Sequence, residues 1–397
     1  RVMNAMGVDA MTGHWEFTYG AERVEELIGT LDFPFLAGNV KDKTWDEDIF
    51  EHTKMFERGG VKIAVIGQAF PYTPIANPRY MMPDWSFGIQ EDKVQERVDA
   101  AREAGAELIV LNSHNGFDVD RKMASRVSGI DVILTGHTHD AIPAVIKVKD
   151  TLLIATGSHG KFLGRLDLEV KNKKVTNYSY KLMPIFSDAI KPDPEIAEVI
   201  RKVRAPYEKT VNTVLGKTES HLYRRGNFNG TFDDLICDAL LTERDSQIAL
   251  SPGFRWGATL LPGDDITADT LYSQTAITYP NVYRNEMTGA FLKEILEDVA
   301  DNLFNTDPYY QQGGDMVRVG GMGYTINTNN PMGKRISGMT LLKTGKPIEA
   351  TKNYVVSGWA SVNEGTKGPP VYDVVTKYIE KKKAIRRSRR RQRKQTH

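Results

Sequence analysis

The sequence is poor in cysteine and in long apolar runs. Its 397 residues include one cysteine, Cys237, which excludes an internal disulfide and a metal site built from several thiolates. No apolar stretch approaches the roughly 20 residues that a membrane span needs. The first residues, Arg1-Val2-Met3-Asn4, contain neither the charged nor the apolar segment of a secretory signal. Any metal site in this chain is therefore expected to use mainly histidine and carboxylate ligands.

The composition is typical of a soluble globular protein, with 40% apolar and 26% charged residues. A chain of this length exceeds one ordinary hydrophobic core, so we expect two domains. We predict a catalytic domain at residues 1–188, a linker helix at 189–212, a smaller α/β domain at 213–380 and a basic, disordered tail at 381–397.

The formal net charge of +1 hides a basic run near the C-terminus. Ten lysines and arginines and no acidic residue occur between Lys381 and Lys394, and without them the net charge becomes −9. Such a run can contact the phosphates of nucleic acid or of an anionic membrane, but no interleaved aromatic residues accompany it. We therefore interpret it as a solvated tail and expect no nucleic-acid partner and no membrane partner.

Strand and helix patterns alternate in the first 185 residues. The apolar periodicity predicts strands at 8–11, 61–66, 107–111, 131–135, 151–156 and 163–170, and helices at 46–58, 91–104 and 121–127. This alternation favours an α/β domain, in which ligands gather where strands end. Residues 192–211 have the pattern of the linker helix, and the patterns at 232–241, 247–250 and 287–303 indicate the smaller domain.

Four of the eight histidines follow predicted strands. His14 follows the strand at 8–11, His114 the strand at 107–111, and His137 and His139 the strand at 131–135. One such histidine would be more simply an exposed or hydrogen-bonded side chain. Four at the same kind of position favour metal ligation.

Several segments resemble one enzyme family. Gly-His-Trp-Glu-Phe at 13–17, Asn-Ser-His-Asn-Gly at 112–116 and Gly-His-Thr-His at 136–139 are similar to metal motifs of the dinuclear metallophosphoesterases, in the 5'-nucleotidase branch. Residues 13–20, 68–86 and 251–257 resemble more specifically the SoxB thiosulfohydrolases. The resemblance implies a four-layer α/β/β/α metallophosphoesterase sandwich, incomplete at its N-terminus, and a smaller α/β 5'-nucleotidase-type C-terminal domain.

The resemblance also implies two divalent metal ions, Mn²⁺ in the family. It implies that His14, His114 and His137 bind one ion and that His139 binds the other. Zinc or iron would suit the same residue types. The family's Asp-x-His motif and bridging aspartate would precede Arg1, so we expect the chain as given to be an inactive fragment.

The substrate that the resemblance implies is a sulfonate bound through sulfur to a cysteine of the SoxYZ carrier protein. Hydrolysis would release sulfate in the periplasm, and we expect a monomer. Trp15 stands where nucleotidases have a histidine that stabilises the leaving group, and an indole cannot transfer a proton at neutral pH. The alternatives are a 5'-nucleotidase or other metal-dependent phosphoesterase, and an inactive fragment with a nucleic-acid-binding tail.

Arg255, within Gly-Phe-Arg-Trp-Gly, is the main candidate for binding substrate oxygens, because a guanidinium matches a tetrahedral oxyanion. Trp15 and Tyr19 are the other substrate-binding candidates. His159 stands in Gly-Ser-His-Gly-Lys and is not expected to be a ligand. Aromatic residues in the long connection at 70–87 predict the wall of an access channel; they are Phe70, Tyr72, Tyr80, Trp85 and Phe87.

Overall fold

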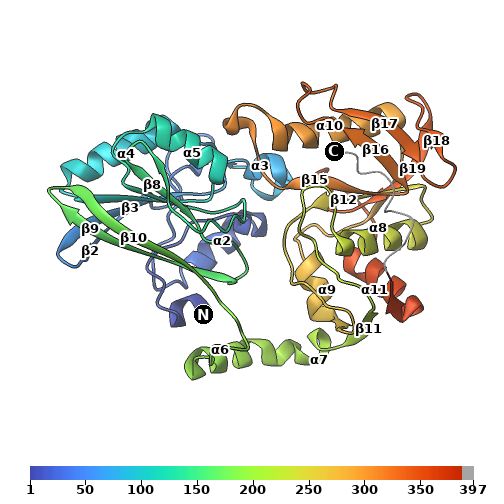
Figure 1. Ribbon diagram of the computed structural model, residues 1–397, viewed down its shortest axis with the longest axis horizontal. Coiled ribbons are helices and arrows are strands. Elements are labelled where there is room, and N and C mark those ends of the chain that lie inside the picture. Colours follow the sequence, from blue (N-terminus) through green and yellow to red (C-terminus); the bar gives the residue numbers. More distant parts are fainter. Residues whose placement is uncertain (387–397) are drawn as a thin grey trace. The chain divides into compact units, whose positions relative to one another are not determined.

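The protein divides into two compact units, each of mixed α/β structure (Figure 1). The computed structural model describes residues 1–386. Unit 1 consists of Arg1–Arg204 and Asp307–Gly313, and unit 2 of Ala205–Thr306 and the chain from Gly314 onward. The segment Asp307–Gly313 is therefore part of unit 1 although both of its neighbours in sequence belong to unit 2. The predicted domain at 213–380 included this segment, whereas the structure places it in unit 1.

Unit 1 contains a six-stranded sheet, two small antiparallel sheets and several helices. Its elements are α1 (Val2–Ala5), η1 (Glu16–Tyr19), α2 (Ala21–Ile28), β1 (Lys41–Asp42), β2 (Thr53–Arg58), β3 (Val61–Gln68), α3 (Thr73–Ala76), η2 (Arg79–Met81), β4 (Trp85–Ser86), α4 (Glu91–Glu103), β5 (Leu108–Ser113), α5 (Phe117–Arg126), β6 (Val132–Thr135), β7 (Ile146–Val148), β8 (Thr151–Ala155), β9 (Phe162–Lys171), β10 (Lys174–Pro184), α6 (Pro194–Arg204) and η4 (Pro308–Tyr310).

The six-stranded sheet has the order β2-β3-β5-β6-β8-β7. Its four central strands are parallel, whereas β2 and β7 pair antiparallel at the edges. Helices α4 and α5 cover one face, and Ile66, Ile109 and Ile133 of the sheet pack there against Val98 and Met123 of the helices (Figure 1). Burying such side chains supplies about 2 kcal/mol each, so this layer fixes the sheet whose strand ends carry the histidines.

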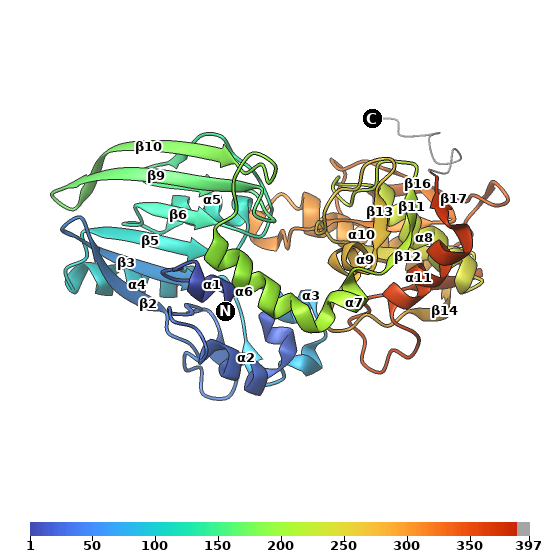
Figure 2. The same ribbon diagram turned by 90° about the horizontal axis from the view of Figure 1, so that it is seen from below.

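Two further parts complete unit 1. Strands β9 and β10 form a long antiparallel ribbon, and α1 lies against α6 (Figure 2). A second core surrounds the buried ring of Phe17, which meets Phe35, Trp85 and Phe87 edge to face. This core holds the loop that carries His14.

Unit 2 is built from three small sheets and the helices packed on them. Its elements are η3 (Ala205–Tyr207), α7 (Glu208–Val211), β11 (Val214–Thr218), α8 (Thr231–Glu243), β12 (Ile248–Gly253), β13 (Asp265–Thr267), α9 (Ala268–Thr275), β14 (Tyr283–Thr288), α10 (Gly289–Phe304), β15 (Asp315–Gly320), β16 (Met322–Ile326), β17 (Ile336–Leu341), β18 (Lys346–Pro347), β19 (Asn353–Gly358), α11 (Val371–Lys382) and β20 (Ala384–Ile385).

The central sheet of unit 2 has the order β14-β19-β12-β15, and two three-stranded sheets, β13-β11-β20 and β16-β17-β18, accompany it. Two apolar cores hold the unit together. In one, the buried Phe232 and Ile236 of α8 pack with Val375 and Ile379 of α11. In the other, α10 packs against the sheet through residues such as Leu296.

The mixed α/β architecture expected from the sequence is confirmed. The helix predicted at 46–58 is wrong, because residues Thr53–Arg58 form β2 and pair with β3 along its whole length. The apolar spacing of that stretch comes from Ile49 and Phe50, which pack around Phe17 instead of forming a helix stripe. Of the strand predicted at 8–11, Met11 alone pairs, in a single bridge with Phe35.

The linker helix and the tail also differ from the expectation. The helix ends at Arg204 and continues as η3 and α7. Pro206 explains the break, because proline lacks an N–H and disfavours the helical conformation of the residue before it. Residues 381–386 are not a disordered tail, since Lys381 and Lys382 end α11 and β20 pairs in parallel with β11. The rest of the predicted tail, 387–397, lies outside the described residues.

Across residues 1–386, none of the helices combines the length and apolar character that crossing a membrane would require.

Candidate metal centre

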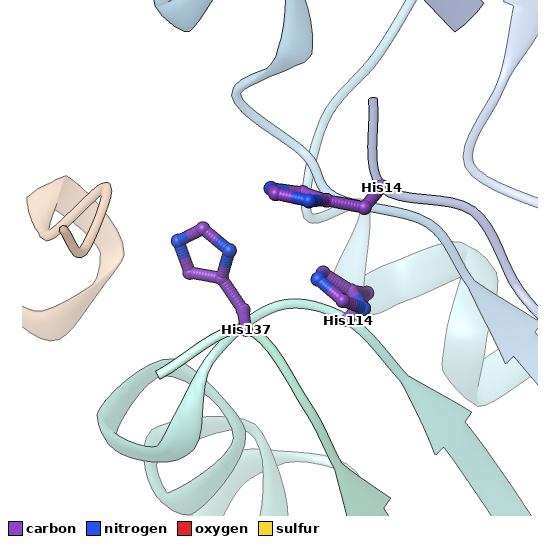
Figure 3. Close-up of side chains that lie close together, drawn as sticks. All are labelled: His14, His114 and His137. Atoms are coloured by element: carbon purple, nitrogen blue, oxygen red, sulfur yellow. The ribbon is translucent and has the colours of Figure 1, made fainter. Parts of the chain in front are cut away.

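Three loops bring three histidines together, and two of these loops follow strands of the six-stranded sheet (Figure 3). His114 directly follows β5, and His137 lies two residues after β6. Because β5 and β6 are parallel and place Ser113 opposite Thr135, both loops leave the sheet at the same edge.

The loop of His14 is held at this edge of the sheet by hydrogen bonds from the residues that follow β3. The amide of Phe70 donates a hydrogen bond to the Gly13 carbonyl at 3.0 Å, and the Thr73 hydroxyl donates to the His14 carbonyl at 3.3 Å. The His14 amide donates to Glu16 Oε2 at 2.5 Å. The His14 loop is thus held from both sides.

The three imidazoles face one another. The His14 ring stacks on the His114 ring with centroids 4.5 Å apart, and its centroid lies 5.0 Å from that of His137. Their potential ligand nitrogens all lie within 4.8 Å of one another (Figure 3). Three nitrogens so arranged can bind one metal ion, as imidazoles do for Zn²⁺, Fe²⁺ or Mn²⁺.

Desolvation favours the neutral form of His114. Desolvation, together with a smaller contribution from the charge of His139, lowers the pKa of His114 to about 4. His114 is therefore deprotonated at neutral pH. Within residues 1–386 its buried Nε2 has no hydrogen-bond partner, which is uncommon for a buried polar atom and is what a ligand nitrogen requires.

The tautomer of His137 follows from its partner. His137 Nε2 lies 2.8 Å from the carbonyl oxygen of Gln312. A carbonyl can only accept a hydrogen bond, so Nε2 must carry the proton and Nδ1 keeps the lone pair that binds a metal. A backbone carbonyl behind a ligating histidine is a common way of orienting it.

The loop after β6 is strained where the histidines stand. His137 has φ of 71° and His139 has φ of 60°, in the left-handed region that few residues other than glycine occupy. Each such residue costs about 1–3 kcal/mol, and such strain clusters at functional sites.

Two glycines make room for the cluster. A Cβ at Gly136 would lie 3.1 Å from Nδ1 of His114. Gly116 has φ of 107°, and a Cβ there would lie 3.2 Å from the Thr138 methyl group. Larger residues at either position would displace a histidine loop.

Asp120, in the first turn of α5, ties the two strand ends together behind the histidines. Its fully buried carboxylate accepts hydrogen bonds from Ser113 Oγ at 2.8 Å, Asn115 Nδ2 at 2.9 Å and Thr135 Oγ1 at 2.5 Å. Burial nevertheless raises the pKa of Asp120 to about 6. The sequence did not single out this residue, because nothing in the pattern at 117–120 distinguishes it from Asp118.

Aromatic rings wall the cluster on two sides. Trp15 stacks on His14 with centroids 4.8 Å apart, and Phe70 stacks on His137 with centroids 4.1 Å apart. That Phe70 and Tyr72 line an access channel stays a prediction, whereas the prediction is wrong for Trp85 and Phe87. Trp85 and Phe87 pack in the core around Phe17, and Tyr80 is exposed.

The other predicted residues of unit 1 lie outside the three-histidine group. The ring of His139 meets that of His159 edge to face, with centroids 5.5 Å apart. That His139 serves a second ion stays a prediction. Tyr19, at the end of η1, has 57% of its surface exposed and none of the ring contacts that the structure records joins it to a histidine. Its substrate role also stays a prediction.

Arg255 belongs to unit 2, where it follows β12. Its side chain is 12% exposed, so it is not a surface arginine in a turn, and its Nε lies 3.9 Å from Asp315 Oδ1. Arg318 donates to the other oxygen of Asp315 at 2.8 Å. Desolvation raises the pKa of Asp315, and the two guanidinium groups oppose that shift.

Behind Arg255 lies a buried ionic network that the sequence did not predict. Asp233 accepts from Arg224 Nε at 2.8 Å and pairs with Arg318 Nε at 3.2 Å, and all three side chains are almost completely buried. Burial of this carboxylate raises its pKa, while the two guanidinium groups lower it. Arg224 also donates to the Pro252 carbonyl at 2.8 Å, so the network contacts the segment that carries Arg255.

Comparison with known proteins agrees with this architecture. Residues 212–376 match the family model "5'-nucleotidase, C-terminal domain". Bovine 5'-nucleotidase is 24% identical over 410 residues, which cover 89% of this chain and 68% of that protein. The structure of a 5'-nucleotidase precursor from Thermus thermophilus superposes with a TM-score of 0.83 at 20% identity and covers 97% of this chain and 83% of its own.

A more specific match is the sulfate thiohydrolase SoxB of Thermus thermophilus, solved in complex with glycerol. It superposes with a TM-score of 0.93 at 34% identity, over 97% of this chain and 72% of that one. The chain belongs to the SoxB family, within the 5'-nucleotidase superfamily. The resemblance seen in the sequence is thereby confirmed.

Like its named relatives, this SoxB family member is a hydrolase. The residues of the site fit a divalent metal ion: a neutral His114 with a buried nitrogen that has no hydrogen-bond partner, a His137 whose tautomer leaves Nδ1 as ligand, and His14 facing both. The identity of the ion does not follow from imidazole ligands alone.

Proposed function

We propose that the protein hydrolyses a cysteine S-thiosulfonate on the SoxYZ carrier and releases sulfate. In this reaction the oxygen of water bonds to the sulfonate sulfur, the sulfur–sulfur bond breaks and its electron pair leaves with the persulfide on the carrier cysteine. The membership of the SoxB family supports this substrate over a nucleotide.

The observation that carries the proposal is the contact between Trp15 and His14. The indole stacks on the candidate ligand with planes inclined by 21°. Because an indole has no proton to transfer at neutral pH, this position offers no general acid for an alkoxide leaving group. A persulfide is a much weaker base than an alkoxide and departs without that help.

Each part of the cluster has a defined task in this reaction. His14, His114 and His137 would hold the ion, with Asp120 fixing the strand ends behind the two loops of the sheet. An ion bound there would polarise the sulfonate oxygens and lower the pKa of water. Mn²⁺ is our proposed ion, as the family resemblance implies, with a second ion on His139.

Trp15 and Phe70 exclude water from two sides of the imidazoles, which strengthens the electrostatic contacts within the site. Arg255 is our proposed ligand of the sulfonate oxygens, because its fork of N–H groups fits such an oxyanion. The carrier partner and a periplasmic location are further parts of the proposal, and both rest on the family.

The test compares two products from the same preparation. The full-length natural protein is incubated with thiosulfonated SoxYZ and with AMP, each with added Mn²⁺ or with a chelator. We expect manganese-dependent sulfate release and at most a trace of phosphate. Phosphate without sulfate would refute the proposal and favour the nucleotidase alternative, to which the 24% identity with bovine 5'-nucleotidase points.

A further inference from the structure

The segment Asp307–Gly313, here called the strap, contacts one histidine of the candidate metal centre. It belongs to unit 1, although its neighbours in sequence on both sides belong to unit 2. At its far end the carbonyl of Gln312 accepts the hydrogen bond from His137 Nε2 at 2.8 Å. The strap therefore reaches a candidate ligand from a point 175 residues away in the sequence.

The near end of the strap is anchored on α5. Lys122 Nζ lies 2.6 Å from Asp307 Oδ1 and 3.9 Å from the centre of the Tyr309 ring. The carboxylate of Asp307 also accepts from the Tyr309 amide at 2.9 Å, which fixes the turn of η4. Lys122 therefore contacts both Asp307 and Tyr309.

The middle of the strap is anchored on two further elements. The Tyr309 hydroxyl donates to Glu91 Oε2 at 2.7 Å, in the first turn of α4. The hydroxyl of Tyr72, itself 8% exposed, donates to the Tyr309 carbonyl at 2.8 Å. Tyr309 is therefore held through its ring, its hydroxyl and its backbone.

Most of the strap is half-buried, and only Tyr310 is exposed. The ion pair between Lys122 and Asp307 is itself partly exposed, and such pairs contribute little to stability. We therefore assign these anchors a role in positioning the strap. The position that they fix is that of one carbonyl oxygen. That oxygen selects the tautomer of His137 that presents Nδ1 to the other two imidazoles.

We infer that the strap is a positioning element for the metal centre, with Tyr309 as its anchor and the Gln312 carbonyl as its contact to His137. The inference rests on the metal site of the proposed function but not on the substrate. It assigns a role at the site to a segment that carries no ligand of its own.

A substitution at Gly313 can change the orientation of the Gln312 carbonyl. Its φ of 76° is strained for any other residue, so Gly313→Val turns the peptide plane that carries this carbonyl. Gly345→Val is the matched control, because Gly345 has φ of 69° with open space around it, in a turn of unit 2. Tyr309→Phe removes only the hydrogen bond to Glu91 and is the conservative second variant.

Two readouts need no substrate. In the metal-free full-length protein labelled with ¹⁵N-histidine, the His137 nitrogen shifts report the tautomer, and His137→Gln assigns the signals. Titration with Mn²⁺, followed by electron paramagnetic resonance, gives the dissociation constant.

We expect wild type and Gly345→Val to show His137 protonated at Nε2. We expect Gly313→Val to show mixed tautomers and a Mn²⁺ dissociation constant raised by about tenfold or more. Tyr309→Phe should act in the same direction by a smaller factor, and it carries the test alone if Gly313→Val does not fold. An unchanged tautomer and affinity in the folded variants would overturn the inference. Since neither readout involves sulfate, this result and the failure of the proposed function are distinguishable.

Discussion

The Thr135 hydroxyl donates a hydrogen bond to Asp120 Oδ2 at 2.5 Å, deep behind the histidine cluster. Through this contact and those from Ser113 and Asn115, one carboxylate holds the ends of both β5 and β6. The position of two candidate ligands therefore depends on a residue outside the three-histidine group.

Asp120 and His114 should give the protein opposite pH dependences. Burial raises the pKa of Asp120 from 3.8 to about 6, so the folded state binds this proton more tightly and stability from this group falls as the pH rises from about 4 to 6. Burial lowers the pKa of His114 from 6.5 to about 4, so stability from this group rises as the pH rises from about 4 to 6.5.

Single substitutions should reveal how the stability contributed by each group depends on pH. We expect His114→Gln to lose stability, relative to wild type, as the pH rises through this window, and Asp120→Asn to gain it. Each difference should be on the order of 3 kcal/mol, because one pKa unit is about 1.4 kcal/mol. Urea unfolding at several values between pH 4 and 7, in the presence of a chelator, measures both. If the free energy of unfolding of both variants changed with pH in parallel with that of the wild type, this account of burial would be contradicted.

Metal binding should depend on the three-histidine group. His137→Ala removes one of three imidazoles, and we expect it to weaken Mn²⁺ or Zn²⁺ binding by more than tenfold in calorimetric titration. His221→Ala is the control, because His221 is exposed in unit 2, where its ring contact is with Tyr223. Equal affinities of the two variants would show that the ion binds elsewhere.

The ionic network of unit 2 should be essential for its stability. Asp233→Ala leaves Arg224 and Arg318 buried with less opposing charge, which we expect to cost about 3–5 kcal/mol in the free energy of unfolding. Asp265→Ala breaks an exposed pair with Lys217 and should cost less than about 1 kcal/mol. Denaturant unfolding of both variants is the measurement, and similar losses would speak against a structural role for the network.

Arg255 should contribute to substrate binding. We expect Arg255→Ala to lower kcat/KM for the carrier-bound thiosulfonate by roughly 10- to 100-fold, the range for a lost hydrogen bond to a charged group. Arg284→Ala is the control, since its guanidinium donates to the backbone carbonyls of Arg244 and Asp245. A drop of the same size in the control would remove the specific role of Arg255.

The sequence predicted the parts of the fold that depend on local pattern. The parallel strands at 61–66, 107–111 and 131–135 are rich in aliphatic residues, most of them buried or half-buried. His114 and His137 follow the second and third of these strands, as expected. The helix at 91–104 was equally clear. The edge strand β2 was missed, because its pairing with β3 outweighs a local spacing that suggested a helix.

What the sequence could not show are the contacts made across long separations. The hydrogen bond between Gln312 and His137 uses a backbone carbonyl, which leaves no mark in residue type. Asp120 is one of two acidic residues in its helix, and its burial is set by strands that lie elsewhere in the chain. Phe70 is one of five aromatic residues in the connection at 70–87, but its stacking on His137 follows only from the fold.

The most direct test of the central claim follows the oxygen of water. Full-length protein with Mn²⁺ is given thiosulfonated SoxYZ in H₂¹⁸O, and the sulfate released is analysed by mass spectrometry, with His114→Gln as the matched inactive variant. Attack of water on the sulfonate sulfur predicts one ¹⁸O atom in each sulfate and almost no sulfate from His114→Gln. Sulfate without ¹⁸O, or sulfate release that His114→Gln retains, would contradict the claim that this histidine cluster is the hydrolytic centre.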